Sequence, residues 1–187
     1  MKVSLGPKTI AFPLPAYLVG SYDVDGRPNV MTAAWGGILS SDPPCLGVSV
    51  RPSRWTHAGI VKNKAFTVGF PGSNMARETD FVGLYSGKGR DKFKEASLTA
   101  ARSQLVDAPY VDECPVVAEC ALEKTLELGS HTLFVGRVLD VKANDGVLSD
   151  GQLDMGKVDP LVFSPEGEYF QIGPFVAKAF SVGKYPK

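Results

Sequence analysis

The segment from Asn29 to Gly37 is the first part of this sequence that could do chemistry. It reads as a strand, yet it carries small side chains where a strand usually carries bulky ones. A flat ligand could therefore lie directly against the backbone and use its N–H and C=O groups. This pattern favours a planar heterocycle, and the alternative is tight strand packing around a core tryptophan, Trp35.

A second segment, from Ser49 to His57, brings hydroxyl and guanidinium groups together where a strand ends and a short helix begins. Guanidinium, hydroxyl and helix N-terminal N–H groups are the donors that bind an anionic phosphate. The segment therefore predicts a phosphate site, and the alternative is an ordinary capped helix beside two solvated arginines, Arg51 and Arg54.

Several other chemistries are excluded by counting residues. The sequence has no HExxH motif and only two histidines, His57 and His131, so we expect no metal site. The segment Gly83 to Gly89 has the wrong spacing for a Walker loop, and no GxGxxG motif follows a strand. The odd number of cysteines, three without a CxxC pair, favours buried reduced thiols.

The composition describes a globular chain without a dominant charge. Lysine plus arginine and aspartate plus glutamate both number 20, so the formal net charge is zero and nucleic acid is an unfavourable partner. No apolar run reaches the roughly 18 residues that a membrane span requires. Because Lys8, Pro13 and Pro15 interrupt the N-terminal segment, we expect no secretory signal and a cytoplasmic protein.

The first half of the chain predicts a hairpin, two further strands and two helices. Residues 16–24 and 29–35 flank Asp25-Gly26, which is typical of a tight reversal. We expect strands at 45–51 and 65–70, separated by a short helix ending at Asn63 that could begin with a hydroxyl cap. A second helix follows from Asn74 to Tyr85, and residues 86–93 are expected to form an exposed, mobile loop.

The second half is expected to be mostly strand. Residues 116–128 alternate between apolar and polar side chains, which predicts a strand with one buried and one wet face. A strand at 131–142 follows, then a turn at 144–146 and a late strand pair at 161–163 and 169–172. We predict a mainly β fold, with one domain spanning 1–187, about seven short strands, two or three short helices and a closed or nearly closed sheet.

Six blocks occur in an order that resembles the flavin reductase-like family, and within it the flavoredoxins. The blocks are PxPAYLVG (13–20), NVMTAAW (29–35), SxDPP (40–44), SVRPSRWT (49–56), SGKGRDKF (86–93) and GSHTLFVGRV (129–138). The resemblance covers nearly the whole chain. It implies an antiparallel, Greek-key FMN-binding split β-barrel that works as a homodimer and holds FMN non-covalently near the dimer interface.

The resemblance also assigns candidate residues. It implies that the flavin ring lies along Asn29, Met31, Thr32, Ala33, Ala34 and Trp35, largely through backbone contacts. The ribityl chain and phosphate would fall to Ser49, Arg51, Ser53 and Thr56, with Ser86 and Lys92 in the loop that closes over the phosphate. His131 would be the catalytic candidate beside the ring, with a hydrogen-bonded strand residue as the alternative, and His57 is expected on the helix surface.

Three functions stay open at this point. An FMN-dependent oxidoreductase would take electrons from NAD(P)H, although Ser130 replaces the acidic residue found before this histidine in many nicotinamide-using relatives. A flavoredoxin-type electron carrier would hold FMN tightly and accept electrons from a redox protein, such as a ferredoxin or a cytochrome. The third possibility is another planar ligand, such as haem, or none.

Overall fold

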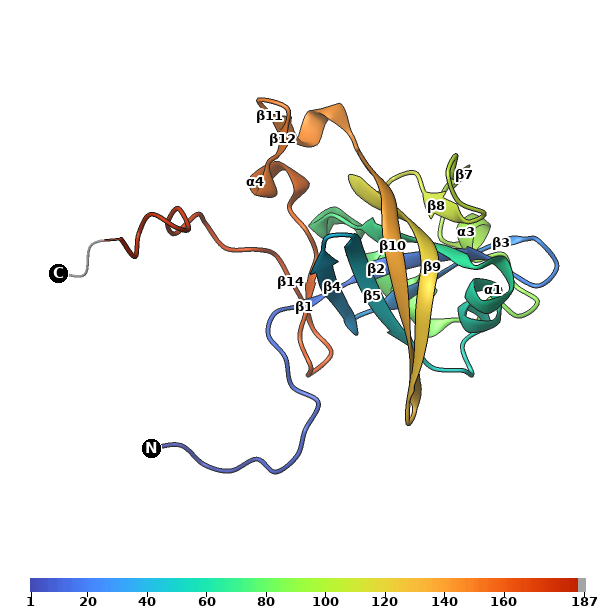
Figure 1. Ribbon diagram of the computed structural model, residues 1–187, viewed down its shortest axis with the longest axis horizontal. Helices are drawn as coiled ribbons and strands as arrows, with labels where there is room; N and C mark the ends of the chain where they lie inside the picture. Colours follow the sequence, from blue (N-terminus) through green and yellow to red (C-terminus); the bar gives the residue numbers. More distant parts are fainter. Residues whose placement is uncertain (185–187) are drawn as a thin grey trace.

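A curled antiparallel sheet of seven strands dominates the computed structural model, which describes residues 1–184 (Figure 1). The strand order is β3-β2-β6-β9-β10-β5-β4. The bounds are β2 (Tyr17–Tyr22), β3 (Pro28–Ala33), β4 (Gly36–Ser41), β5 (Pro44–Val50), β6 (Ala65–Phe70), β9 (Val116–Leu128) and β10 (His131–Ala143). Both end strands, β3 and β4, pair on one edge only within residues 1–184, so the barrel is split rather than closed by hydrogen bonds.

One buried cluster shows that the sheet wraps around a common core. Met31 and Ala33 of β3 pack in the same cluster as Leu46, Val48 and Val50 of β5, although these strands lie far apart in the strand order. A flat sheet could not bring them together, so the sheet curls, as a barrel does. The cluster is completed from α1, β2, β6, β9 and β10 by Val19, Ile60, Phe66, Val68, Ala118, Cys120 and Phe134.

The predicted β2–β3 hairpin is confirmed. Tyr22 pairs with Pro28 next to the turn and Tyr17 pairs with Ala33 at the far end. Gly26 has a φ of +80°, a conformation that glycine adopts without steric cost. The turn therefore fixes the register that places the small residues of β3.

The predicted alternation of buried and wet positions along β9 is wrong. All five residues from Val116 to Cys120 are buried, whereas the last six residues of the strand are exposed. The first part is covered on both faces, since Ala118 and Cys120 join the central core while Val117 joins a second cluster outside the sheet. The second part of β9 extends with β10 beyond the body (Figure 1).

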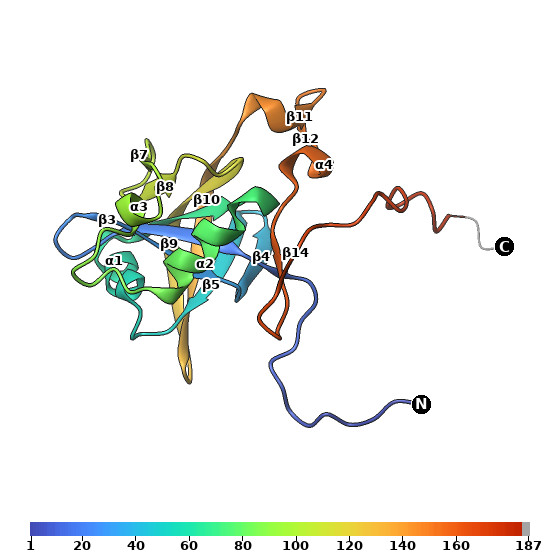
Figure 2. The ribbon, with the colours of Figure 1, turned by 180° about the vertical axis from the view of Figure 1, so that it is seen from behind.

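Helices cover the outer side of the hairpin (Figure 2). They are α1 (Trp55–Asn63), the 3-10 turn η1 (Ser73–Met75), α2 (Ala76–Leu84) and α3 (Lys92–Glu95). The expected hydroxyl cap of α1 is wrong, since its N-cap residue is Arg54 and no side chain caps it. The loop expected at 86–93 is wrong in part, because Gly87, Lys92 and Phe93 are buried and α3 begins at Lys92.

Short strand pairs and turns complete the fold. The late hairpin is confirmed as β13 (Val162–Phe163) and β14 (Tyr169–Phe170), which form a three-stranded sheet with β1 (Leu14–Pro15). The remaining elements are β7 (Ala100–Arg102), β8 (Pro109–Val111), η2 (Asp145–Val147), β11 (Leu148–Ser149), β12 (Gln152–Leu153) and α4 (Met155–Val158). No helix in residues 1–184 is long and apolar enough to cross a membrane.

The three cysteines are free and buried, as expected. Burial is the main cause that raises the pKa of the Cys114 and Cys120 thiols to about 12. They are structural side chains of the core and its flank.

Candidate functional site

A cavity of about 410 Å³ lies along the end of β3, between the end of β5, α2 and the β13–β14 hairpin. The small residues that follow one another on β3 form its floor, and His131 at the start of β10 forms part of its wall. Eight of the candidate residues meet here, namely Met31, Thr32, Ala33, Ala34, Trp35, Ser49, Arg51 and His131.

A second cavity, of about 120 Å³, adjoins the first at the N-terminus of α1. Three residues line both cavities, Met31, Arg54 and Gly83, so the two cavities lie side by side. The remaining candidates except Asn29 line this smaller cavity, namely Ser53, Thr56, Ser86 and Lys92.

The free backbone edge of β3 can bind a flat polar ligand in the larger cavity. Because β3 ends the strand order, one of its edges pairs with no strand in the part of the chain that the structure describes. Unpaired N–H and C=O groups on such an edge can bond to a ligand instead. Thr32 uses its hydroxyl elsewhere, donating to the carbonyl oxygen of Thr79 and fixing α2 against β3.

Trp35 is not the core tryptophan of the packing alternative. Its side chain is 46% exposed and stacks on His131, with ring centroids 5.9 Å apart and an interplanar angle of 20°. Its carbonyl oxygen accepts a hydrogen bond from the backbone N–H of Ser49 at 2.8 Å. The two aromatic rings therefore form one wall of the larger cavity, supported by β5.

The two histidines have different surroundings. Burial and the nearby Arg51 guanidinium lower the pKa of His131, so its ring is neutral at pH 7, and its Nδ1 lies 2.8 Å from the Ser130 hydroxyl. His57 lies on α1 with its side chain half-buried, and it lines neither cavity. Its Nε2 bonds to the Thr132 hydroxyl at 2.9 Å and its ring meets Phe134 edge-on.

The smaller cavity holds a buried cation. Lys92 is only 3% exposed, and its Nζ donates to the carbonyl oxygen of Val82 at 2.9 Å. Burial, followed by repulsion from Arg54, lowers the pKa of Lys92 to about 8. Neither cation forms an ion pair with a carboxylate within residues 1–184, so the cavity favours an anion.

Asn29 lies behind the smaller cavity rather than in it. Its Nδ2 donates to the Thr56 hydroxyl at 2.7 Å, and both side chains are buried. Its Oδ1 is buried and has no hydrogen-bond partner in the described part of the chain. Asn29 therefore orients Thr56, while the predicted direct contact of Asn29 with the ring stays a prediction.

Sequence reasoning missed several lining residues. Asp80, Gly83 and Leu84 of α2 line the larger cavity, and their spacing of three and four places them on one helix face, a signal that could have identified them. Phe163 and Tyr169 come from the β13–β14 hairpin, which is distant in the sequence, and no local pattern indicates that this hairpin reaches the cavity. No cluster of metal-ligating side chains occurs among residues 1–184.

Comparison with known proteins agrees with this architecture. Residues 9–173 match the model of the flavin reductase like domain. Flavoredoxin of Desulfovibrio vulgaris (Miyazaki F) is 46% identical, with a TM-score of 0.94 over 98% of this chain and 100% of that one. Flavoredoxin from Methanosarcina acetivorans is 32% identical, with a TM-score of 0.91 over 98% of both chains.

The chain also has a relative that is similar in sequence over most of its length. An uncharacterized protein of Archaeoglobus fulgidus is 39% identical over 144 residues, which cover 77% of this chain and 80% of the relative. The split barrel and the family predicted from the six sequence blocks are therefore confirmed. This chain belongs to the flavin reductase-like family.

Proposed function

We propose that this chain is an FMN-binding oxidoreductase that acts as a single domain and passes electrons through non-covalently bound FMN. The carrying observation is the direct junction of two unlike cavities. One is broad and follows the open backbone edge of β3, and the other is small and lined by two cations. This pairing matches a molecule with a flat heterocycle at one end and a phosphate at the other.

The size of the smaller cavity supports FMN rather than FAD. Its volume of about 120 Å³ suits one phosphate group. Gly87 forms its far wall, where a Cβ atom would lie 2.1 Å from Asn29 Oδ1 and 2.9 Å from Trp55 Cδ1. The loop therefore lies directly on the hairpin and α1, which leaves no room for a second phosphate between Gly87 and these elements.

Different residues of the chain would bind the ring and the phosphate of FMN. Bound FMN would supply the electron-transfer chemistry, so the site needs no acid–base pair of its own. The β3 edge would bind the polar rim of the ring, and Trp35 with the neutral His131 would flank it. Arg54, Lys92 and the hydroxyls of Ser53, Thr56 and Ser86 would bind the phosphate.

A homodimer is part of the proposal. Exposed apolar side chains follow one another from the larger cavity onto β4, with Trp35 46%, Ile38 83% and Leu39 49% exposed, and Trp35 lines that cavity. A patch of this kind is typical of a protein interface, and a second copy would shield the ring from water. Sedimentation of the FMN-loaded protein tests this, and a stable monomer of 20.0 kDa would reject it.

The electron donor separates two forms of the proposal. NAD(P)H is the donor of a reductase, whereas a redox protein such as a ferredoxin or a cytochrome is the donor of a flavoredoxin-type carrier. The 46% identity to a flavoredoxin and the Ser130 before His131 favour the second form.

An absorbance spectrum of the purified protein, followed by anaerobic NADH and then NADPH, tests both forms. Flavin bands that bleach within seconds identify a reductase. Bands that persist until dithionite or a reduced ferredoxin is added identify a carrier. A colourless protein that takes up no added FMN contradicts the proposal.

A further inference from the structure

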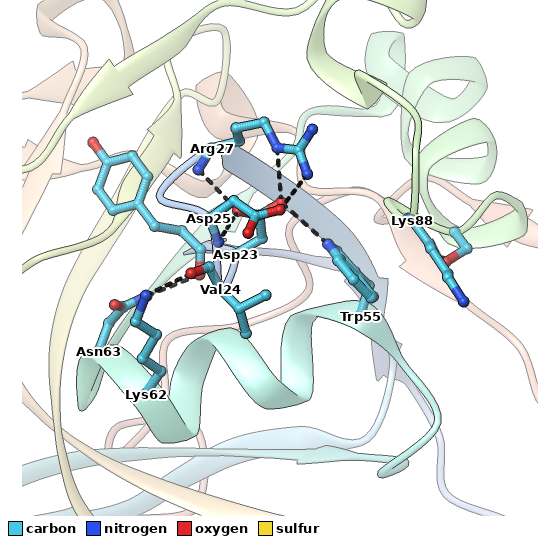
Figure 3. A network of polar contacts seen from close by, with 10 residues as sticks. Asp23, Val24, Asp25, Arg27, Trp55, Lys62, Asn63 and Lys88 are labelled. Carbon is cyan, nitrogen blue, oxygen red and sulfur yellow. Dashed lines mark hydrogen bonds and ion pairs between the residues drawn. The ribbon is translucent and has the colours of Figure 1, made fainter.

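A buried carboxylate, Asp23, joins the β2–β3 hairpin to the first residue of α1 (Figure 3). Its Oδ1 accepts the backbone N–H groups of Asp25 and Arg27, both at 2.9 Å. Its Oδ2 accepts the Arg27 Nε–H and the Trp55 indole N–H, both at 3.3 Å. One oxygen therefore holds the turn, and the other reaches across to the helix.

Trp55 is the residue through which this contact reaches the smaller cavity. It lines that cavity beside Thr56, and Gly87 packs against its Cδ1. The first turn of α1 has no side-chain cap, so the indole bond to Asp23 is the polar side-chain contact that fixes its first residue.

The hairpin also holds the other end of α1. Lys62 Nζ donates to the carbonyl oxygen of Val24 at 2.6 Å, and Asn63 Nδ2 donates to that of Tyr22 at 2.8 Å (Figure 3). Lys62 and Asn63 bond to backbone carbonyl oxygens, so a side-chain substitution at Asp23 removes neither acceptor. The contact that it does remove, to Trp55, lies at the N-terminal end beside the smaller cavity.

We propose that Asp23 is a positioning residue for the FMN phosphate. Through the Trp55 indole it holds the first turn of α1 and the Gly87 wall in the arrangement that closes the smaller cavity around one phosphate. Asp23 lines neither of the two cavities, so it acts through Trp55. The inference rests on the proposed binding of FMN.

The carboxylate is also ionised in the folded protein. Burial alone would raise the pKa of Asp23, but hydrogen bonds from Arg27, Asp25 and Trp55 together with the Arg27 charge bring it below its ordinary value. A charged acceptor makes a stronger hydrogen bond to the indole than a neutral one. Its hydrogen-bond partners are the donors of Asp25, Arg27 and Trp55, and Arg27 is also a cation.

The substitution Asp23→Asn tests this role with little change of shape. An amide oxygen at the Oδ1 position can still accept from the turn, whereas an amide nitrogen at the Oδ2 position cannot accept from the indole. Asp25→Asn is the matched control, because Asp25 also pairs with Arg27, at 2.6 Å, but is 61% exposed and does not contact Trp55. Trp55→Phe removes the indole N–H and keeps an aromatic ring.

The readout is the affinity for FMN compared with riboflavin, which lacks the phosphate, in fluorescence titrations. We expect Asp23→Asn and Trp55→Phe each to weaken FMN by about tenfold, with riboflavin changed less than twofold. Asp25→Asn should leave both affinities within about twofold. If Asp23→Asn does not fold, Trp55→Phe carries the same test.

Two results would overturn the inference. Equal weakening of FMN and riboflavin would show a general structural role, and unchanged FMN affinity in both variants would show that the contact does not reach the phosphate. Unaltered protein that binds no flavin would instead reject the proposed function itself.

Discussion

Trp35 and His131 stack from two strands that flank β5, since Trp35 directly precedes β4 and His131 is the first residue of β10. The stack exists because the Trp35 carbonyl oxygen accepts the Ser49 N–H of β5, and Ser49 in turn pairs with Leu133 of β10. This ladder brings the two rings to the same end of the sheet. The stack closes one side of the larger cavity with two neutral aromatic rings.

Ala34→Leu should block the flat ligand. Ala34 is buried and lines the larger cavity but lies outside the buried core clusters, so a larger side chain would fill ligand space rather than disrupt the core. We expect FMN affinity to fall by more than about tenfold. Ala58→Leu on the exposed side of α1 is the control. Normal FMN binding by Ala34→Leu would remove the ring from this cavity.

Arg54 should matter more for the phosphate than Arg51. Arg54 lines both cavities, whereas Arg51, the residue expected from the sequence to bind phosphate, lines only the larger one. We expect Arg54→Ala to weaken FMN by about 1.5 to 3 kcal/mol, the range for a charge-assisted hydrogen bond. Arg51→Ala should have a smaller effect. Isothermal titration compares them, and the reverse order would contradict this placement.

Lys92 should make FMN binding depend on pH. Its pKa of about 8 in the free protein means that the cation is lost as the pH rises through 8, so FMN affinity should fall between pH 7.5 and 9.5. Lys92→Met should bind FMN weakly and without this pH dependence. Lys94→Met on the exposed side of α3 should retain it. A flat profile in the unaltered protein would contradict the role of Lys92.

The stability of the flavin-free protein should change in the opposite direction. Because the pKa of Lys92 is lowered on folding from its usual 10.5, the folded state binds fewer protons than the unfolded state between pH 8 and 10.5. The contribution of Lys92 to the free energy of unfolding should therefore become more favourable across that range. Urea denaturation of Lys92→Met and the unaltered protein at both ends of the range measures it, and parallel curves would disprove it.

Gly87→Ala should distort the smaller cavity and so weaken FMN binding. The added Cβ would lie 2.1 Å from Asn29 Oδ1 and 2.9 Å from Trp55 Cδ1. The loop that carries residue 87 would therefore have to move away from these two side chains. We expect a loss of FMN affinity of at least about tenfold. Gly146→Ala, at a position with nothing within 4 Å, is the control. If Gly87→Ala binds FMN normally, the wall does not form part of the site.

Local patterns allowed much of the fold to be predicted. The strand expected at 65–70 has those bounds, and the Asp25-Gly26 turn gave the correct hairpin, because alternation and turn chemistry act between near neighbours. The sequence predicts an exposed loop at Lys92 and Phe93, whereas both side chains are buried. Their burial could not be predicted, because it depends on partners elsewhere in the chain. Phe93 packs with Leu18 and Val117 in the second cluster, and no local pattern encodes that contact.

The candidate site could be predicted where it is continuous in sequence. Residues 31–35 do line one cavity, since they form one continuous segment at the end of β3 and just beyond it. The sequence could not predict that Arg54 lines both cavities while Arg51 lines only the larger one. This difference depends on how α2 packs on β3 through the contact of Thr32 with Thr79. The same packing brings Gly83 to both cavities.

The burial of the cysteines affects how readily a reduced flavin in the same protein could lead to their oxidation. Reduced flavins react with dioxygen and release hydrogen peroxide, which oxidises thiolates much faster than thiols. With pKa values of about 12, Cys114 and Cys120 are almost entirely protonated at neutral pH, and Cys45 is also buried. A protein with this chemistry would generate its own oxidant, and the Cys114 and Cys120 thiols, buried and protonated, would present little thiolate to it.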